Sequence, residues 1–147
     1  MAKTPKESQI EMRELVMPHH SNPRNTVFGG AVMSWIDRAT AMAAQRHSNR
    51  SVVTAHMDSL SFKAPVKIGE HVLIRAKVQY VGKSSPVVEA KVWGEDPIAN
   101  KSWEVANAYV IFVALDENNR PCPIPPLKLE TDEERKAFDR AKKFKRN

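Results

Sequence analysis

The feature that most constrains the fold is a stretch from Gly30 to about Ala44 that is apolar on almost every side of a helix. Its apolar side chains recur at the i, i+3, i+4, i+7 spacing of an α-helix, and they are Val32, Trp35, Ile36, Ala39, Met42 and Ala43. A helix that is apolar nearly all round is stable only when other parts of a structure cover it. The rest of the chain must therefore supply a surface that wraps around this helix.

Five predicted strands supply this surface. The segments 52–60, 71–81, 87–93 and 103–115 are rich in β-branched and aromatic residues, which are common in strands, and 9–17 is predicted as an edge strand. Alternation within 71–81 places one set of side chains on a single face, namely Val72, Ile74, Ala76, Val78 and Tyr80. Turn residues at 82–85 and 96–100 favour antiparallel neighbours. We expect a curved antiparallel sheet around one long central helix, an α+β arrangement called the hot-dog fold.

The boundaries of this single domain follow from the same patterns. Residues 1–8 are expected to form a flexible N-terminus, residues 9–130 the hot-dog domain, and residues 131–147 a charged C-terminal helix and tail. The last helix is predicted to begin after Thr131, because Thr131 and Glu134 have the spacing of a capping box. The open edges of such a sheet are often covered by another subunit, so at least a dimer is expected.

Length and charge narrow the range of function classes. The chain has 147 residues, the size of one domain, and much of its net charge of +6 lies in residues 142–146. It has no zinc-ligand spacing and no basic stripe interleaved with aromatics, so we expect no nucleic-acid partner. No apolar run approaches the ~18 residues of a membrane span. The single cysteine, Cys122, fits a reducing compartment, and a cytoplasmic protein that binds no membrane is expected.

Asp37 is the residue of the apolar helix that its neighbours do not explain. The residues three and four positions away are Met33, Ser34, Thr40 and Ala41, and none of them is a cation. A buried carboxylate without a partner is costly or is driven to protonate. One interpretation places Asp37 on a solvated side of the helix or against loop amides. The other makes it a general base or a nucleophile in a half-buried site.

Gly29 and Gly30, directly before the helix, are the second candidate. Glycines at a helix start leave backbone N–H groups uncovered, and together with the helix dipole these groups can bind a developing oxyanion. A Gly-Gly pair is also common in ordinary turns. Gly30 and Asp37 lie seven positions apart, on the order of 10 Å along a helix, which is too far for one reacting carbonyl to contact both. We therefore predict that Gly30 of one chain faces Asp37 of another.

The side-chain amide of Asn22 is a third candidate, because it could hydrogen-bond a substrate or position a water molecule. Ser21-Asn22-Pro23 is also ordinary turn chemistry. From composition alone, the turn is the favoured interpretation.

Taken together, these features resemble the acyl-CoA thioesterases of the hot-dog fold. The resemblance rests on Asn22, Val27-Phe28-Gly29-Gly30, Asp37, the strand Val52-Val53-Thr54-Ala55 with Asp58 and Phe62, the turn Gly82-Lys83-Ser84-Ser85, and the ending Pro123-x-Pro125. It runs from about Met12 to the C-terminal helix. The nearest branch is that of the brain-type cytosolic acyl-CoA hydrolases and their single-domain bacterial relatives.

The resemblance implies an enzyme that hydrolyses acyl-CoA to a carboxylic acid and CoA without a cofactor. It makes Asn22 and Asp37 catalytic residues contributed by opposing subunits of a dimer, commonly assembled as a trimer of dimers, with the Gly30 N–H polarising the carbonyl. It also implies a set of substrate-binding residues, namely Phe28, Gly29, Thr54, Lys83, Ser84 and Ser85. The last four are expected at the CoA moiety, whose phosphates suit hydroxyls and a lysine.

Two departures from the family pattern lie in the loop before the helix. Phe28 stands where some relatives have His, so no histidine base is carried over to it. Asn25 stands where relatives often have Gly, and the loop can survive because Asn tolerates positive φ.

Three alternative functions fit the sequence less well. An acyl-CoA hydratase or dehydratase of this fold needs an Asp/His pair that is missing around Asn22-Pro23. A non-catalytic acyl-CoA-binding or regulatory module gains nothing from a carboxylate such as Asp37 beside a polyanionic ligand. A metal site at His19-His20 is not expected, because adjacent side chains diverge and no further ligand lies at a suitable spacing.

Overall fold

A computed structural model describes residues 1–58 and 60–145 of the chain. Its elements in chain order are the short 3₁₀ turn η1 (Pro5–Ser8), β1 (Ile10–Leu15), the 3₁₀ turn η2 (Pro18–His20), α1 (Gly29–Ser48), β2 (Ser51–Met57), β3 (His71–Val81), β4 (Pro86–Asp96), β5 (Lys101–Leu115) and α2 (Asp132–Lys142). The five strands form one sheet in the order β1-β3-β4-β5-β2. Every pair of neighbouring strands is antiparallel.

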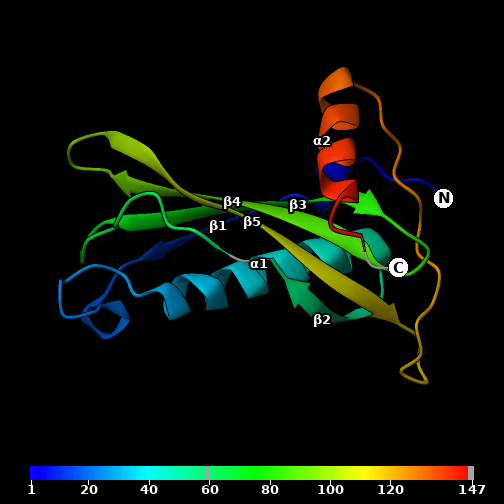
Figure 1. Ribbon diagram of the computed structural model, residues 1–147, viewed down its shortest axis with the longest axis horizontal. Coiled ribbons are helices and arrows are strands. Elements are labelled where there is room, and N and C mark those ends of the chain that lie inside the picture. Colours follow the sequence, from blue (N-terminus) through cyan, green and yellow to red (C-terminus); the bar gives the residue numbers. More distant parts are fainter. Residues whose placement is uncertain (59, 146–147) are drawn as a thin grey trace.

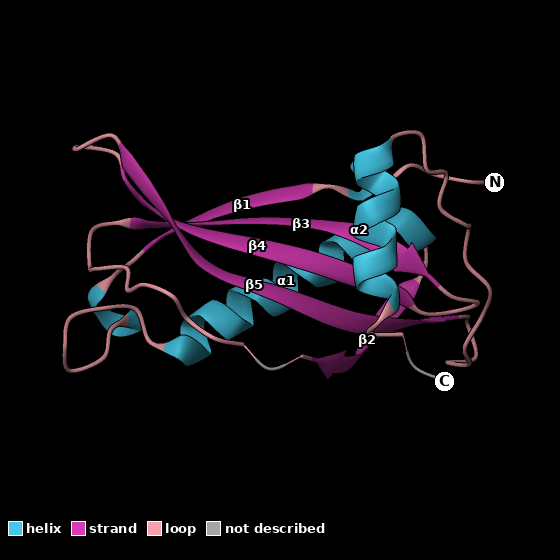
Figure 2. Cartoon of the chain, turned by 45° about the horizontal axis from the view of Figure 1, so that its top comes forward, coloured by secondary structure: helices cyan, strands magenta, loops and turns pink. Residues whose placement is uncertain are grey.

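The sheet curves around α1, which lies on one face, while α2 crosses the opposite face (Figures 1 and 2). The core between sheet and helix contains the side chains of α1 that the sequence pattern selected, among them Val32, Trp35, Ile36, Ala39 and Ala43, none more than 3% exposed. The α+β hot-dog fold is thereby confirmed. The helix is buried on its sheet-facing side only, since Met33 and Met42 on its other side are 44% and 39% exposed.

A β-bulge in β3 changes which way one predicted core residue faces. Val78 pairs with Val88, but Tyr80 pairs with Val87, so Gln79 is an extra residue in the strand. The prediction that Tyr80 faces the same way as Val78 is therefore wrong. Val78 packs into the main core under α1, whereas the Tyr80 ring lies 4.8 Å from that of Phe138 in α2.

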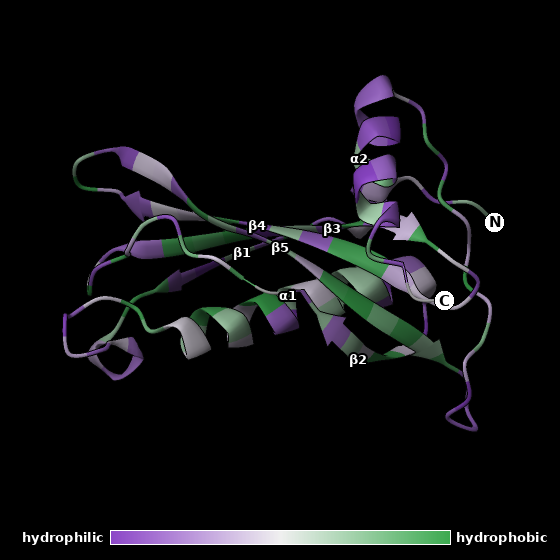
Figure 3. Cartoon of the chain, viewed as in Figure 1, coloured by the Kyte–Doolittle hydropathy of each residue, from purple (hydrophilic) through white to green (hydrophobic). Residues whose placement is uncertain are grey.

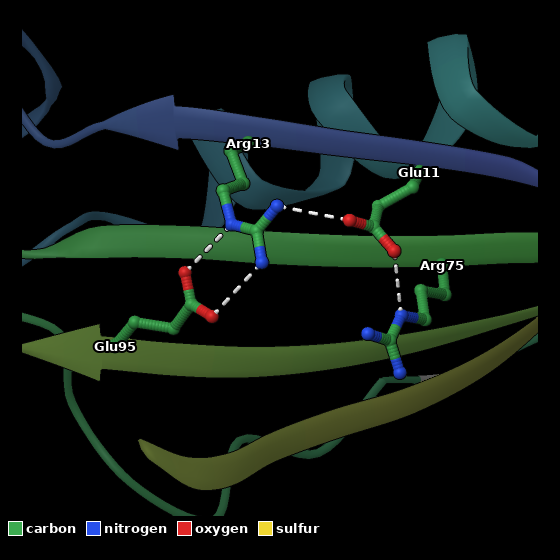
Figure 4. Close-up of polar contacts among 4 residues, drawn as sticks. All are labelled: Glu11, Arg13, Arg75 and Glu95. Atoms are coloured by element: carbon green, nitrogen blue, oxygen red, sulfur yellow. Dashed lines mark hydrogen bonds and ion pairs between the residues drawn. The ribbon is translucent and has the colours of Figure 1, made fainter. Parts of the chain in front are cut away.

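The face of the sheet away from α1 is mostly polar. Its edge at β1 carries a charged ladder made of Glu11, Arg13, Arg75 and Glu95, in which Arg13 bridges the two glutamates and Arg75 pairs with Glu11, each at 2.9 Å (Figure 4). Such exposed pairs contribute little stability, but charges on an edge strand discourage pairing with other strands. Coloured by hydropathy, α2 is largely hydrophilic, as expected for a helix with one narrow packed side (Figure 3).

The N-terminal segment packs near the C-terminal end of α1. The Lys3 ammonium donates to the Arg46 carbonyl at 3.0 Å, and Pro5 and Ser8 are buried. The predicted capping box of α2 is confirmed, since the Glu134 N–H donates to Thr131 Oγ1 and the Thr131 N–H to Glu134 Oε1, both at 3.1 Å. The flexibility predicted for residues 1–8 is a statement about motion and stays a prediction. In the described part of the chain, no helix is long and apolar enough to span a membrane.

Candidate active site

Asp37 lies half-buried near the middle of α1, on the side of the helix next to β2. Thr54 of β2 donates its hydroxyl proton to Asp37 Oδ1 at 2.9 Å. Among the described residues this is the only partner of the carboxylate, and the adjacent Arg38 turns instead toward Glu14, 3.8 Å away. Asp37 is thus a carboxylate oriented by one hydroxyl and neutralised by no cation, with its second oxygen open.

The start of α1 presents unused backbone donors. The N–H groups of Gly29 and Gly30 donate to no described residue, whereas those of Ala31 and Val32 both reach the Phe28 carbonyl. The first N–H groups of any helix lack intrahelical acceptors and carry the positive end of the dipole. The sequence therefore places two free donors where a negative oxygen can be bound.

Two aromatic rings stand directly over these glycines. A Cβ atom added to Gly30 would lie 3.0 Å from the Phe28 ring, and one added to Gly29 would lie 3.3 Å from the Phe62 ring. Both rings are partly exposed, at 41% and 45%. A side chain at either position would require the neighbouring ring to move by a few tenths of an ångström, so the glycines favour this close approach of two apolar rings to the start of α1.

Asn22 forms the turn that composition favoured. Its Oδ1 accepts from the Arg24 N–H at 2.9 Å and the Thr26 N–H at 3.2 Å, and Nδ2 lies 2.9 Å from Thr26 Oγ1. Asn25 adopts φ 62°, the positive value that its side chain was expected to tolerate. Because Oδ1 is occupied and Nδ2 carries two protons, one amide proton of Asn22 stays available to a ligand.

The turn at 82–85 is a second cluster of free donors. The N–H groups of Lys83, Ser84 and Ser85 donate to no residue in the described part of the chain, while the carbonyls of all three accept backbone bonds. Successive free N–H groups form concave sites suited to anions. The hydroxyls of the two serines are half-buried, and the Lys83 side chain is exposed.

The structure separates the predicted site residues into three groups. Asn22, Phe28, Gly29 and Gly30 lie together at the N-terminal end of α1, and Asp37 with Thr54 lies near its middle. The 82–85 turn lies at the far end, because Ser84 bonds to Ala114 of β5, which pairs with β2 just after α1 ends. A helix of 20 residues spans about 30 Å, so one chain alone does not gather all three groups.

Two contacts of this region were missed by the sequence reasoning. The Thr54–Asp37 bond joins residues 17 positions apart on different elements, and no local pattern reports it. His20, considered in the sequence only as a metal ligand, has its ring centroid 4.9 Å from that of Trp35. In the described residues, no group of three or more His, Cys, Asp or Glu side chains is arranged to hold a metal ion.

Comparison with known proteins places the chain among thioesterases. A profile described as "Thioesterase superfamily" matches residues 24–99. An uncharacterized acyl-CoA thioester hydrolase of Bacillus subtilis, YkhA, is 40% identical over 129 residues, which cover 88% of this chain and 75% of that protein.

Solved structures agree with this similarity. The acyl-CoA hydrolase of Staphylococcus aureus, solved with butyryl-CoA, CoA and CoA disulfide, is 35% identical with a TM-score of 0.90 over 97% of this chain and 87% of that one. A hexameric acyl-CoA thioesterase is 29% identical with a TM-score of 0.92 over 97% and 92% of the two chains.

The S. aureus enzyme has also been solved with alanine in place of one aspartate, one threonine or one asparagine, the last of these with CoA bound. In that protein the asparagine precedes the aspartate by 15 positions and the threonine follows it by 17. Asn22, Asp37 and Thr54 have the same spacing here.

Proposed function

The chain belongs to the thioesterase superfamily and is an acyl-CoA thioester hydrolase, and we propose that it acts at a site shared by two copies of the chain. The observation that carries this proposal is the position of the two reactive groups on one helix. The free N–H of Gly30 and the open carboxylate of Asp37 are seven positions apart, on the order of 10 Å. A thioester carbonyl bound at Gly30 is therefore out of reach of Asp37 in the same chain.

The two sheet edges indicate where the second copy binds. The β1 edge carries the charged ladder, whereas β2, from Ser51 to Met57, contains no Asp, Glu, Lys or Arg. Exposed apolar side chains lie on β2 itself and on the open side of α1, including Val53 at 47% and Met33 at 44%. An uncharged edge strand with apolar neighbours is prone to pair with another chain. We propose that β2 and the open side of α1 form the subunit interface, which brings each Asp37 toward the glycines of its partner.

Within this shared site each group has a defined role. The Gly30 N–H and the helix dipole stabilise the negative charge that develops on the thioester oxygen, and the free amide proton of Asn22 supports the bound substrate. The partner's Asp37 activates a water molecule or attacks the carbonyl carbon directly. In both routes the carbon–sulfur bond breaks and CoA leaves as its thiol. The acyl group receives its new oxygen from water in the general-base route. In the nucleophilic route it receives an Asp37 oxygen through a mixed anhydride, and water that attacks the Asp37 carbon of this anhydride releases the acid and restores the carboxylate. The shared spacing of Asn22, Asp37 and Thr54 with the three residues replaced in the S. aureus enzyme supports this assignment.

The CoA moiety is proposed to reach the 82–85 turn. The three free N–H groups there, the serine hydroxyls and Lys83 suit phosphate oxygens. Because this turn is remote from Gly30 in one chain, we propose that the turn serving each site comes from a neighbouring subunit. Hexameric relatives support a trimer of dimers as the assembly. The single cysteine and the cytosolic relatives support a cytoplasmic location.

The first test is release of free thiol from acyl-CoAs of several chain lengths. Wild type is expected to release CoA, and Asp37→Ala and Asn22→Ala to release it far more slowly. If wild type released no CoA at any chain length, the assignment as an acyl-CoA hydrolase would be wrong. Full activity of Asp37→Ala would instead show that the site is assigned to the wrong residue.

The second test uses mixed dimers of two inactive chains. Gly30→Val blocks the donor site and Asp37→Ala removes the carboxylate, so each homodimer is expected to be inactive. A heterodimer purified through two different tags retains one site with both groups intact, and about half of wild-type activity is expected. Heterodimers as inactive as their parents would refute the shared site. The nucleophile and general-base routes are separated by single turnover in ¹⁸O-water, because only direct attack places ¹⁶O from Asp37 in the product.

A further inference from the structure

His20 is linked to both sets of donors that the proposed site requires, namely the Asn22 amide and the N–H groups of Gly29 and Gly30. It is the last residue of η2 and is partly buried, whereas its neighbour His19 is exposed. The Met17 N–H donates to His20 Nδ1 at 3.1 Å, and the ring meets the buried Trp35 of α1 edge-on, with centroids 4.9 Å apart and planes at 84°. Because Nδ1 accepts this N–H, the ring carries its own proton on Nε2.

The backbone of His20 closes the hairpin that contains Asn22. The Phe28 N–H donates to the His20 carbonyl at 2.9 Å, and the Asn22 N–H donates to the Thr26 carbonyl at 2.8 Å. Between these two bonds, Ser21 and Val27 form an isolated antiparallel β-bridge. Residues 20–28 therefore form a small closed unit, which we call the 20–28 hairpin. Asn22 lies at its turn, and Gly29 and Gly30 follow its last residue.

The side chain of His20 fixes this hairpin to the helix that follows it. Trp35 lies in α1 only two positions before Asp37 and is 3% exposed, so it is an immobile part of the core. The bond to the Met17 N–H sets the rotation of the ring against Trp35. With the ring held, the orientation of the hairpin relative to the first turn of α1 is held as well.

We propose that His20 is a positioning residue that sets the geometry between the Asn22 amide and the Gly30 N–H. The inference rests on the proposed function, in which both donors act on one thioester carbonyl. His20 touches no reacting atom and acts through the hairpin. A change that frees its ring displaces two donors relative to each other, and a displacement of about 1 Å at a reacting centre can lower a rate by up to roughly a hundredfold.

Two variants carrying the same amide group separate positioning from simple packing. In His20→Asn the amide oxygen falls where Nδ1 accepts the Met17 N–H, whereas in His20→Gln it lies one bond further out, near the place of Nε2. We expect kcat of His20→Asn within about threefold of wild type, and that of His20→Gln lower by roughly ten- to a hundredfold, with KM little changed in both. His19→Gln is the packing control: it removes the neighbouring ring, whose centroid lies 4.0 Å from that of His20, but keeps the Met17 bond and the Trp35 contact, so wild-type kinetics are expected.

Equal losses in the Asn and Gln variants, or full kcat in the Gln variant, would overturn the inference. If His20→Gln does not fold, His20→Phe replaces it, since that ring still packs on Trp35 but accepts no bond, and the same loss is expected.

A second readout does not depend on activity. Long-range ¹H–¹⁵N spectra of histidine-labelled wild type, assigned with His20→Asn, should show the ring proton of His20 on Nε2. A proton on Nδ1 would overturn the inference even if the kinetics agreed. Failure of the proposed function would appear differently, as the absence of thiol release by the wild-type protein itself.

Discussion

The two halves of α1 are built from similar residues but differ in what surrounds them. In the first half, the N–H groups of Gly29 and Gly30 donate to no described residue and Asp37 has one hydroxyl as its polar partner. In the second half, Ala39, Ala43, Ala44 and His47 are fully buried. Its end is closed by Asn49 in the left-handed conformation and by the Lys3 ammonium on the Arg46 carbonyl.

The first half of α1 carries the reacting groups, and the second half contributes mainly to the stability of the fold. A reacting group requires open donors and an unneutralised carboxylate, and both destabilise a folded chain unless a rigid neighbour holds them. The closed second half provides that rigidity. Substitutions of the open polar groups in the first half are therefore expected to lower the rate, and substitutions of the buried residues in the second half to lower stability.

The largest expected effect is on the rate, from Asp37→Asn in the open half. The amide keeps the shape of the side chain and can still accept from Thr54, but it neither takes a proton nor attacks a carbonyl. We expect kcat to fall by roughly 10²–10⁴-fold with little change in the melting temperature. Arg38→Gln, at the exposed neighbouring position, is the control and should keep its activity in the thiol-release assay. If Asp37→Asn kept wild-type activity, the conclusion that the first half of α1 carries the chemistry would be wrong.

Ala43→Leu tests the closed half. Ala43 is fully buried between α1 and the sheet, and added methyl groups in a packed core cost about 1–3 kcal/mol. We expect that loss in the free energy of unfolding, measured in urea at fixed protein concentration, with kcat per folded molecule unchanged. Gln45→Leu, exposed on the same half, should stay within about 0.5 kcal/mol of wild type. A stable Ala43→Leu variant with reduced kcat would contradict the assignment of stability to this half.

Thr54→Val examines the contact that orients Asp37. Valine has the shape of threonine, so packing is kept while the 2.9 Å hydroxyl bond to Oδ1 is lost. We expect kcat/KM to fall about tenfold, the equivalent of one hydrogen bond to a charged group, and Thr54→Ser to restore most of it. If Thr54→Ser is as slow as Thr54→Val, the methyl group rather than the hydroxyl is the important part of the side chain.

Much of this fold could be predicted because its signals are local. The 3.6-residue period of α1, the alternation of β3 and the Thr131–Glu134 spacing each report on a few consecutive residues, and the predicted elements are present. The one wrong orientation, that of Tyr80, comes from the bulge at Gln79. A bulge adds one residue to a strand without changing its composition, so alternation continues in the sequence while the chain reverses its faces.

The site was predictable only in part for a related reason. The glycines at the helix start and the uncompensated Asp37 are visible as departures from their surroundings. The Thr54 hydroxyl and the His20 ring become relevant only through contacts with α1, at Asp37 and Trp35. The resemblance names Thr54 as a substrate-binding residue, but no local pattern predicts its contact with Asp37 or that of His20 with Trp35, because these contacts are set by the packing of distant elements.

The smallest expected effect concerns His47, which closes the second half of α1. Its Nε2 lies 2.7 Å from the Pro125 carbonyl and therefore donates to it, while the buried Nδ1 has no partner among the described residues. Burial, helped by the nearby Lys3 ammonium, lowers the pKa of His47 below its ordinary value of about 6.5. The folded protein therefore binds a proton at His47 less readily than the unfolded chain does.

The pH dependence of stability follows from this difference. The free energy of unfolding should be at its full value above about pH 6.5 and should decrease as the pH falls from there through the lowered pKa, because the unfolded chain then binds more protons. His47→Gln keeps a donor for Pro125 but does not titrate, so its stability should fall less between pH 7 and 5 in parallel urea titrations. If the free energy of unfolding changed with pH equally in wild type and His47→Gln, His47 would accept a proton as readily in the folded protein as in the unfolded chain. The contrast between the two halves of α1 would then rest on packing alone.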